Sequence, residues 1–164
     1  MTLAELMADY TPNADFEGFI TNDDWVLAVD TSEDQDAEVS AYAVVQSGIE
    51  GLDSQMNPVT MDKQYIRAGQ STTKTGTQRT FSISGDRYVG DTFQDFAFSH
   101  KIKYGTGEDV NVNYVYFNLK NGKGEKGRAA LIVNSDAAGT SGENSTIAVE
   151  IRKSGAQPDE YTYS

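Results

Sequence analysis

The sequence contains no cysteine and only one histidine, His100, among its 164 residues. A disulfide scaffold, a thiolate metal site and a cysteine nucleophile are therefore excluded. One histidine cannot build a histidine-rich zinc site, and any histidine-based catalytic triad would depend on His100 alone. No metal site and no catalytic residue is expected from these residue types.

Long apolar runs are also missing. No stretch approaches the roughly 20 apolar residues that a membrane-spanning helix needs. The first ten residues, MTLAELMADY, have neither the basic region nor the apolar stretch of a secretory signal. We therefore expect no membrane partner, and a protein that is made in the cytoplasm and stays there or leaves by cell lysis.

Positive charge is absent from the first 62 residues, which carry 14 acidic side chains. Residues 63–164 carry 13 basic and 11 acidic side chains, and the whole chain has a net charge of −12. Such a chain is poorly suited to bind nucleic acid by neutralising phosphates. The acidic segment is either a solvated arm or a surface that meets the basic part of a neighbouring molecule.

Aromatic and β-branched residues dominate what is present, with nine Tyr, seven Phe and one Trp. Their alternation predicts a single, mainly β domain over residues 1–164, built as an antiparallel β-sandwich or barrel-like fold. The N-terminal arm is expected at 1–24. The predicted strands cover 25–31, 39–49, 63–68, 71–84, 109–120, 128–134 and 145–153. The breaker Asn57-Pro58 predicts an extended hairpin loop over 50–62.

One flanking helix is predicted over 91–104. Apolar residues recur there at helical spacing, and Asp91 is a suitable N-cap. Gly105 could supply a left-handed stop. His100 would then be a packed or capping residue beside the buried face. Residues 2–10 are expected to form a short helix or an ordered arm.

A second motif, Gly122-x-Gly124-x-x-Gly127, has the spacing of a dinucleotide-binding fingerprint. That fingerprint needs a buried parallel strand before it and a helix after it. The preceding segment instead alternates polar and apolar residues, and the following one is the short run RAALIVN. The glycines therefore indicate a hairpin tip, and no cofactor is expected.

Paired carboxylates such as Asp23-Asp24 and Asp159-Glu160 lie in expected loops or strand ends. A catalytic pair needs surroundings that separate the two pKa values, and nothing in the pattern predicts this. The segment 31–38 lacks the glycine and final glutamate of a calcium loop. The sequence contains no established nucleophile or metal motif, so we do not expect an enzyme.

The order of the predicted elements resembles that of the major tail tube proteins of long-tailed bacteriophages. Residues 71–107, STTKTGTQRTFSISGDRYVGDTFQDFAFSHKIKYGTG, and residues 114–143, YVYFNLKNGKGEKGRAALIVNSDAAGTSGE, carry this resemblance together with the terminal EYTYS. These segments are similar to the tail tube proteins of phages and phage-tail-like bacteriocins of low-GC Gram-positive bacteria. The resemblance is clearest over about 40–164.

This resemblance implies a structural protein of the virion tail that is made in the bacterial host cytoplasm. Its subunits would form hexameric rings that stack into a hollow tube, with strands of each subunit joined in one inner barrel. Its partners would be further copies of itself, the tape-measure protein, and tail terminator and baseplate proteins. DNA would only pass through the lumen.

A lumen that passes DNA should present acidic and small hydroxyl side chains, because a basic lining would hold phosphates. Candidate lumen or loop contacts are Glu50, Asp53, Asp62, Ser71, Thr73 and Thr75; the other interpretation of each is an ordinary exterior position. Candidate inter-ring contacts are Lys120, Lys123, Lys126 and Arg128, opposite in charge to the N-terminal region.

The alternative function is a non-catalytic, lectin-like β-sandwich binding module on a virion or cell surface. Exposed aromatic rings would then stack on sugars, with Tyr88, Tyr114 and Tyr116 as candidates. Core packing is the simpler interpretation of these tyrosines.

Overall fold

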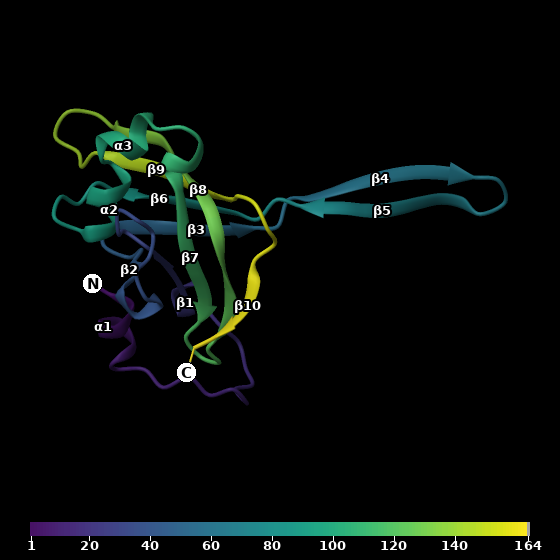
Figure 1. The fold of residues 1–164 in the computed structure, drawn as a ribbon, viewed down its shortest axis with the longest axis horizontal. Helices are drawn as coiled ribbons and strands as arrows, with labels where there is room; N and C mark the ends of the chain where they lie inside the picture. Colours follow the sequence, from purple (N-terminus) through teal and green to yellow (C-terminus); the bar gives the residue numbers. More distant parts are fainter. Residues whose placement is uncertain (164) are drawn as a thin grey trace.

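A computed structural model describes residues 1–163, and its main element is a curled antiparallel sheet that forms a half-barrel (Figure 1). The strand order is β2-β1-β7-β8-β9-β6-β3, and β10 pairs with β8. The strands of this sheet are β1 (Trp25–Val29), β2 (Ala43–Val44), β3 (Ile49–Gln55), β6 (Thr80–Asp86), β7 (Asn111–Asn118), β8 (Lys123–Ala138), β9 (Thr146–Lys153) and β10 (Asp159–Thr162). The prediction of a mainly β, antiparallel fold is confirmed.

The inner face of the half-barrel holds the larger core. Leu52, Ile83, Val149 and Val133 lie side by side across β3, β6, β9 and β8, and Phe93 of the helical segment packs against the same cluster. Each fully buried side chain of this size contributes roughly 1.5–3 kcal/mol. Period-two alternation thus directs one side of each strand into the core.

A smaller core lies on the outer face of β1 and β7. Val115 and Phe117 of β7 pack there with Leu3 and Met7 of the first helix, α1 (Leu3–Met7). The Tyr163 ring stacks on Phe117 with ring centroids 5.5 Å apart. Because both faces of β7 are covered, its burial is continuous from Tyr114 to Asn118 instead of alternating.

The expected loop at 50–62 and return strand at 63–68 are both wrong. Residues 49–55 form β3, and β4 (Pro58–Tyr65) continues outward to pair with β5 (Gly69–Thr77) as a separate two-stranded sheet. The turn lies at 66–68, where Arg67 has a positive φ of 66°. Asn57-Pro58 interrupts the strand only locally, with Asn57 at a φ of 45°, so the hairpin is longer than expected. Figure 1 shows β4 and β5 projecting from the body.

The single helix expected over 91–104 is two helices, α2 (Thr92–Ala97) and α3 (His100–Tyr104). Ser99 is extended, with φ −65° and ψ 153°, and this separates them. The Asp91 N-cap is confirmed because its side chain accepts a hydrogen bond from the Gln94 backbone N–H. Gly105 is not a left-handed stop, since its φ is −71°. His100 is exposed rather than packed, and its ring lies 4.9 Å from that of Tyr104.

The segment 39–49 was expected to be a strand but is mostly irregular. It contains the 3₁₀ turn η2 (Val39–Ala41) and the two-residue strand β2. Gly48, with a φ of 74°, turns the chain into β3. The short N-terminal helix is confirmed, and Thr2 and Glu5 form a capping box at its start.

The glycine motif forms a β hairpin, as predicted. Gly122 has a φ of 72° in the turn after β7, and Gly124 and Gly127 lie within β8. A Cβ atom on Gly124 would lie 1.9 Å from the Tyr116 carbonyl oxygen. This glycine therefore permits close strand pairing, and no helix follows the motif.

Candidate assembly surfaces

The structure divides the candidate lumen residues between two places. Glu50 and Asp53 lie on β3 in the main sheet. Asp62 lies on β4, and Ser71, Thr73 and Thr75 lie on β5 in the projecting hairpin. All six are exposed, but they do not form one surface.

The two faces of the hairpin differ in chemistry. Asp62 pairs with Thr72, whose hydroxyl donates a 2.6 Å hydrogen bond to the Asp62 carboxylate. Lys74 is opposite Thr60 on this same face. Because side chains alternate along a strand, Met61 and its neighbours at 59, 63 and 65 lie on the other face, together with Ser71 and Thr73. We call the first the hydroxyl face and the second the apolar face.

The apolar face was missed in the sequence. The segment PVTMDKQY alternates from Val59 to Tyr65, which is a period-two signal. Its interpretation as a loop rested on Asn57-Pro58 alone. The alternation could have identified both the strand and its two faces.

The outer surface of β3, β6, β9 and β8 is polar and made mostly of small side chains. Asp53, Ser82 and Glu150 lie in one row across it, which continues to Ile132 of β8, and Gly51, Ser84 and Ala148 lie in another. Arg152 lies on the same surface, with its Nη2 2.9 Å from Glu150 Oε2. We call this surface the polar sheet face.

Both sides of this four-stranded region end in unpaired strand edges. Within residues 1–163, β3 pairs only with β6. On the other side, pairing between β7 and β8 ends at Ala130, although β8 continues to Ala138 along β9. Unpaired backbone N–H and C=O groups at such edges can bind a further strand.

A compact joint connects the main sheet to the hairpin. The Gln78 backbone N–H donates to the Asn57 carbonyl at 3.2 Å, which holds the two linking segments together. The Gln78 side chain donates to the Lys153 carbonyl at 3.1 Å. The joint is therefore fixed both across the hairpin and to β9.

Arg79 at this joint belongs to a half-buried polar network. Its Nε lies 2.8 Å from Glu125 Oε1, and its guanidinium lies 4.7 Å from the Phe81 ring centroid and 5.4 Å from that of Tyr116. The Tyr114 hydroxyl donates to Glu125 Oε2 at 3.0 Å. Burial, and then the negative charge of Glu125, raise the pKa of Tyr114 well above its ordinary value.

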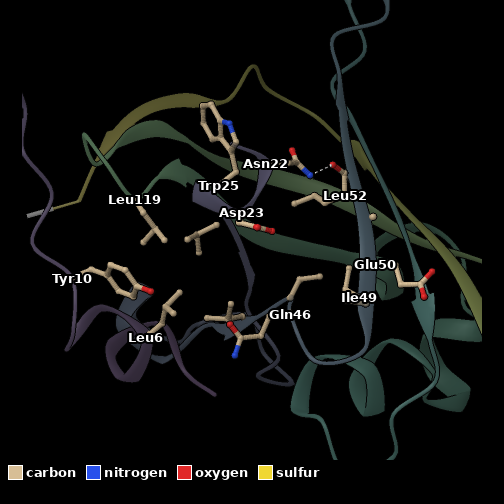
Figure 2. Close-up of a pocket in the computed structure, with 14 residues that line it drawn as sticks. Leu6, Tyr10, Asn22, Asp23, Trp25, Gln46, Ile49, Glu50, Leu52 and Leu119 are labelled. Carbon is tan, nitrogen blue, oxygen red and sulfur yellow. Dashed lines mark hydrogen bonds between the residues drawn. The ribbon is translucent and has the colours of Figure 1, made fainter. Parts of the chain in front are cut away.

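A groove of about 280 Å³ opens between the N-terminal region and β3. Figure 2 shows Leu6, Tyr10 and Leu119 on one side of it and Ile49 and Leu52 of β3 on the other. The Asp23 side chain lies between these two sides (Figure 2). The groove thus combines apolar side chains with the carboxylates of Asp23 and Glu50 and the amides of Asn22 and Gln46.

The four basic candidates do not share one surface. Lys120, Lys123 and Lys126 are exposed, but Lys123 and Lys126 are three positions apart on β8, so they fall on opposite faces. Arg128 is engaged within the chain, with its Nη2 3.1 Å from Glu108 Oε2. This hydrogen bond lowers the pKa of Glu108.

Other kinds of site find little support. Residues 1–163 contain no group of three or more His, Cys, Asp or Glu side chains that could hold a metal ion. No helix in the described part of the chain is long and apolar enough to span a membrane. The prediction that Tyr114 and Tyr116 could stack on sugars is wrong, because both side chains are buried, with only 0% and 5% of their surface exposed. Of the three candidate tyrosines, only Tyr88 is exposed.

No known protein-family model matches this chain, and no curated protein does. Solved structures with a similar fold include a chain of the virion of a native gene transfer agent (GTA) particle. It has a TM-score of 0.56 and 13% identity, and the match covers 89% of this chain and 100% of that one. A chain from the tail of an empty GTA particle with C6 symmetry has a TM-score of 0.55 and 14% identity, over 89% and 100% of the two chains. The fold of this chain is therefore similar to folds that occur in the virion and tail of a gene transfer agent particle.

Proposed function

We propose that this chain is the structural subunit of a phage tail tube or of the tube of a phage-tail-like particle. Copies form hexameric rings that stack into a hollow tube. The observation that carries the proposal is the fold similarity to a chain of a C6-symmetric tail. In the described residues, no strand pairs with the outer edge of β3 or with β8 beyond Ala130 on the side of β7. The protein would act by self-association and not by catalysis.

The strand directions support closure of a ring. The four strands β3, β6, β9 and β8 are antiparallel in succession, so β3 and β8 run in opposite directions. If β3 of one copy pairs with the free edge of β8 beyond Ala130 in the next, the antiparallel alternation continues across the junction. A repeated head-to-tail contact of this kind closes when its rotation completes a circle.

The polar sheet face is the best candidate for the lumen. It carries Asp53, Glu150 and the hydroxyls of Ser82 and Ser84, beside the small residues Gly51 and Ala148. The apolar Ile132 of β8 lies on the same face next to Glu150. Its cation Arg152 is held beside Glu150. Carboxylates and hydroxyls do not displace counterions from DNA, so this face would let a duplex pass without holding it. Asp53 then remains a lumen candidate.

The remaining partners follow from the tail tube resemblance. A tape-measure protein would occupy the bore during assembly, and terminator and baseplate proteins would contact the two ends of the tube. The subunit would be made in the bacterial host cytoplasm and would end in the virion tail. DNA would meet the tube only during ejection.

Electron microscopy of concentrated purified protein tests this function. Sixfold rings or hollow tubes are expected. Small monodisperse particles that gain thermal stability with sugars would instead support the lectin-like binding module, for which exposed Tyr88 is the remaining stacking candidate.

Proline substitution on β3 makes the test specific to the strand edge. Successive backbone N–H groups point to opposite sides of a strand, so Asp53→Pro and Ser54→Pro remove donors on opposite sides. One variant loses a bond to β6 and unfolds more easily. The other should keep the melting temperature of the monomer but form no rings. Normal rings from both variants would contradict edge-to-edge closure.

A further inference from the structure

One contact bridges the groove between the N-terminal region and β3. The Asn22 side-chain amide donates a 3.2 Å hydrogen bond to the Leu52 carbonyl oxygen of β3, which lies 30 residues further along the chain. Figure 2 shows this bond among the residues that line the groove. Asn22 therefore joins the N-terminal region to the backbone of β3.

The Leu52 carbonyl belongs to the strand edge that the proposed ring needs. β6 pairs with β3 on one side, and Asn22 approaches from the groove on the other. In an antiparallel strand, the N–H and C=O groups of one residue point to the same side, and successive residues alternate. Leu52 and Ser54 therefore present their backbone groups to the free edge, whereas Asp53 presents its groups to β6.

A short turn holds Asn22 in this position. In the 3₁₀ turn η1 (Asn22–Asp24), the Thr21 backbone N–H donates to Asp24 Oδ2 at 2.9 Å, and the Asp24 N–H donates to the Thr21 carbonyl at 3.1 Å. The Asp24 carbonyl accepts a 2.7 Å bond from the Leu119 N–H, just after β7. The backbone of the turn is thus fixed to the far side of the groove, and rotation of the Asn22 side chain alone would break its contact with β3.

This contact covers an edge that is otherwise open to pairing. An exposed strand edge is a template for other chains, and proteins commonly cover such edges. Leu52 lies near the middle of β3, so a strand that pairs along the whole edge must displace Asn22. The bond is exposed to solvent, and one neutral hydrogen bond contributes only modestly to stability. Such a contact delays strand pairing without preventing it.

We propose that Asn22 is a clasp that keeps the edge of β3 unavailable in the free subunit. The clasp opens when the β8 edge of a second copy takes over the Leu52 carbonyl. This deepens the proposed function, on which it rests, because ring closure then competes with a bond inside each subunit. Free subunits pair slowly, and rings form once the subunits are concentrated enough to displace the clasp.

Asn22→Ala tests the clasp by removing the amide that covers β3. Rings should form about two- to tenfold faster than with the unmodified protein, as expected for loss of one neutral hydrogen bond. Light scattering measures the rate. Asn13→Ala is the matched control in the same N-terminal arm, because the Asn13 side chain accepts a local bond from the Asp15 N–H at 3.0 Å, and its rate should not change. A rate for Asn22→Ala at or below that of the unmodified protein would overturn the clasp.

A reversible lock tests the same contact in the opposite direction. Asn22→Cys with Asp53→Cys places two thiols at positions that line one cavity of about 370 Å³, in a chain that has no native cysteine. A short bis-methanethiosulfonate should keep the linked subunit monomeric, and a reductant should restore assembly. The control, Asp53→Cys alone with a methanethiosulfonate cap of similar size, should assemble. Rings formed by the linked subunit would contradict the proposal.

A peptide separates the clasp from the proposed function. A labelled peptide AALIVNSDAA, the sequence of residues 129–138 in β8, is titrated onto dilute monomers and its binding followed by fluorescence anisotropy. Asn22→Ala should bind the peptide about two- to tenfold more tightly than the unmodified protein does. Tighter binding without rings or tubes in electron micrographs would support the clasp and refute the tube. Tubes together with equal peptide binding by the two proteins would refute the clasp and leave the tube function standing.

Discussion

Replacing Arg79 with alanine tests the joint between the main sheet and the hairpin. The substitution removes the cation that lies 2.8 Å from Glu125 Oε1 and over the rings of Phe81 and Tyr116. Glu125 would keep only the hydrogen bond from Tyr114. A carboxylate that is half-buried and has lost its cation should destabilise the fold.

The expected size of the effect follows from burial. The Arg79 and Glu125 side chains are 11% and 22% exposed, so breaking their pair should cost less than the roughly 3–5 kcal/mol of a fully buried pair, or about 2–3 kcal/mol. Loss of the two cation–ring contacts adds about 0.5–1 kcal/mol each. We therefore expect Arg79→Ala to lower the free energy of unfolding by about 3–5 kcal/mol.

Urea denaturation of the monomer, followed by circular dichroism, measures this loss. With a typical slope of about 2 kcal/mol per molar urea, the midpoint should fall by about 1.5–2.5 M. Arg152→Ala is the matched control. Its partner is also a glutamate, Glu150, at 2.9 Å, but Arg152 is 51% exposed, so the loss should stay within about 1 kcal/mol. Equal midpoints for the two variants would refute the reasoning that burial makes the Arg79 network stabilising.

Three further predictions concern charge and pH. The double substitution Asp53→Lys with Ser82→Lys should make assembled tubes retain DNA in their bore, because lysines displace counterions from phosphates. That DNA should be protected from nuclease and released by salt. Variant tubes as free of DNA as the unmodified ones would place the polar sheet face outside the lumen. The raised pKa of Tyr114 contributes stability that is fully present below the ordinary pKa of 10.0 and is lost as the pH rises above that value. Tyr114→Phe should therefore reduce the fall in melting temperature between about pH 9 and pH 11. A fall as large as that of the unmodified protein would contradict this prediction. Lys123→Glu with Lys126→Glu should slow or block polymerisation while the monomers stay folded, and tubes of normal length in electron micrographs would contradict an inter-ring role.

Local patterns were enough to predict much of the sheet. Alternating apolar residues located β9, because one side of that strand faces the core. They also located the start of β7, before both of its faces become buried at Tyr114. The Asp91 cap was also predictable, since a capping bond forms within four residues. The helix break at Ser99 was not, because Phe98 before it and Ile102 after it both pack against the same core. Tertiary packing there overrides helical periodicity.

The assembly surfaces were harder to predict because they depend on residues far apart in the chain. The groove combines Leu6, Asp23, Leu52 and Leu119 from four segments, which only the curl of the sheet brings together. The six lumen candidates were chosen by residue type, and type alone could not tell β3 in the body from the projecting hairpin. By contrast, the two faces of the hairpin follow from simple alternation once β4 is assigned as a strand.

The exposed apolar face of the hairpin has a consequence for how the proposed tube would grow. In a free subunit, the apolar face of the hairpin has no cover, and such a ribbon contributes little stability. In the proposed tube, contact with other copies would cover this face and stabilise the ribbon by mass action, so its order would depend on the concentration of subunits. Two free subunits would have to order the hairpin in return for a single contact, whereas a subunit that joins a growing tube would gain contacts within its ring and between rings at once. Addition to a tube would therefore be more favourable than formation of a new nucleus, and the marginal hairpin would favour few long tubes over many short ones.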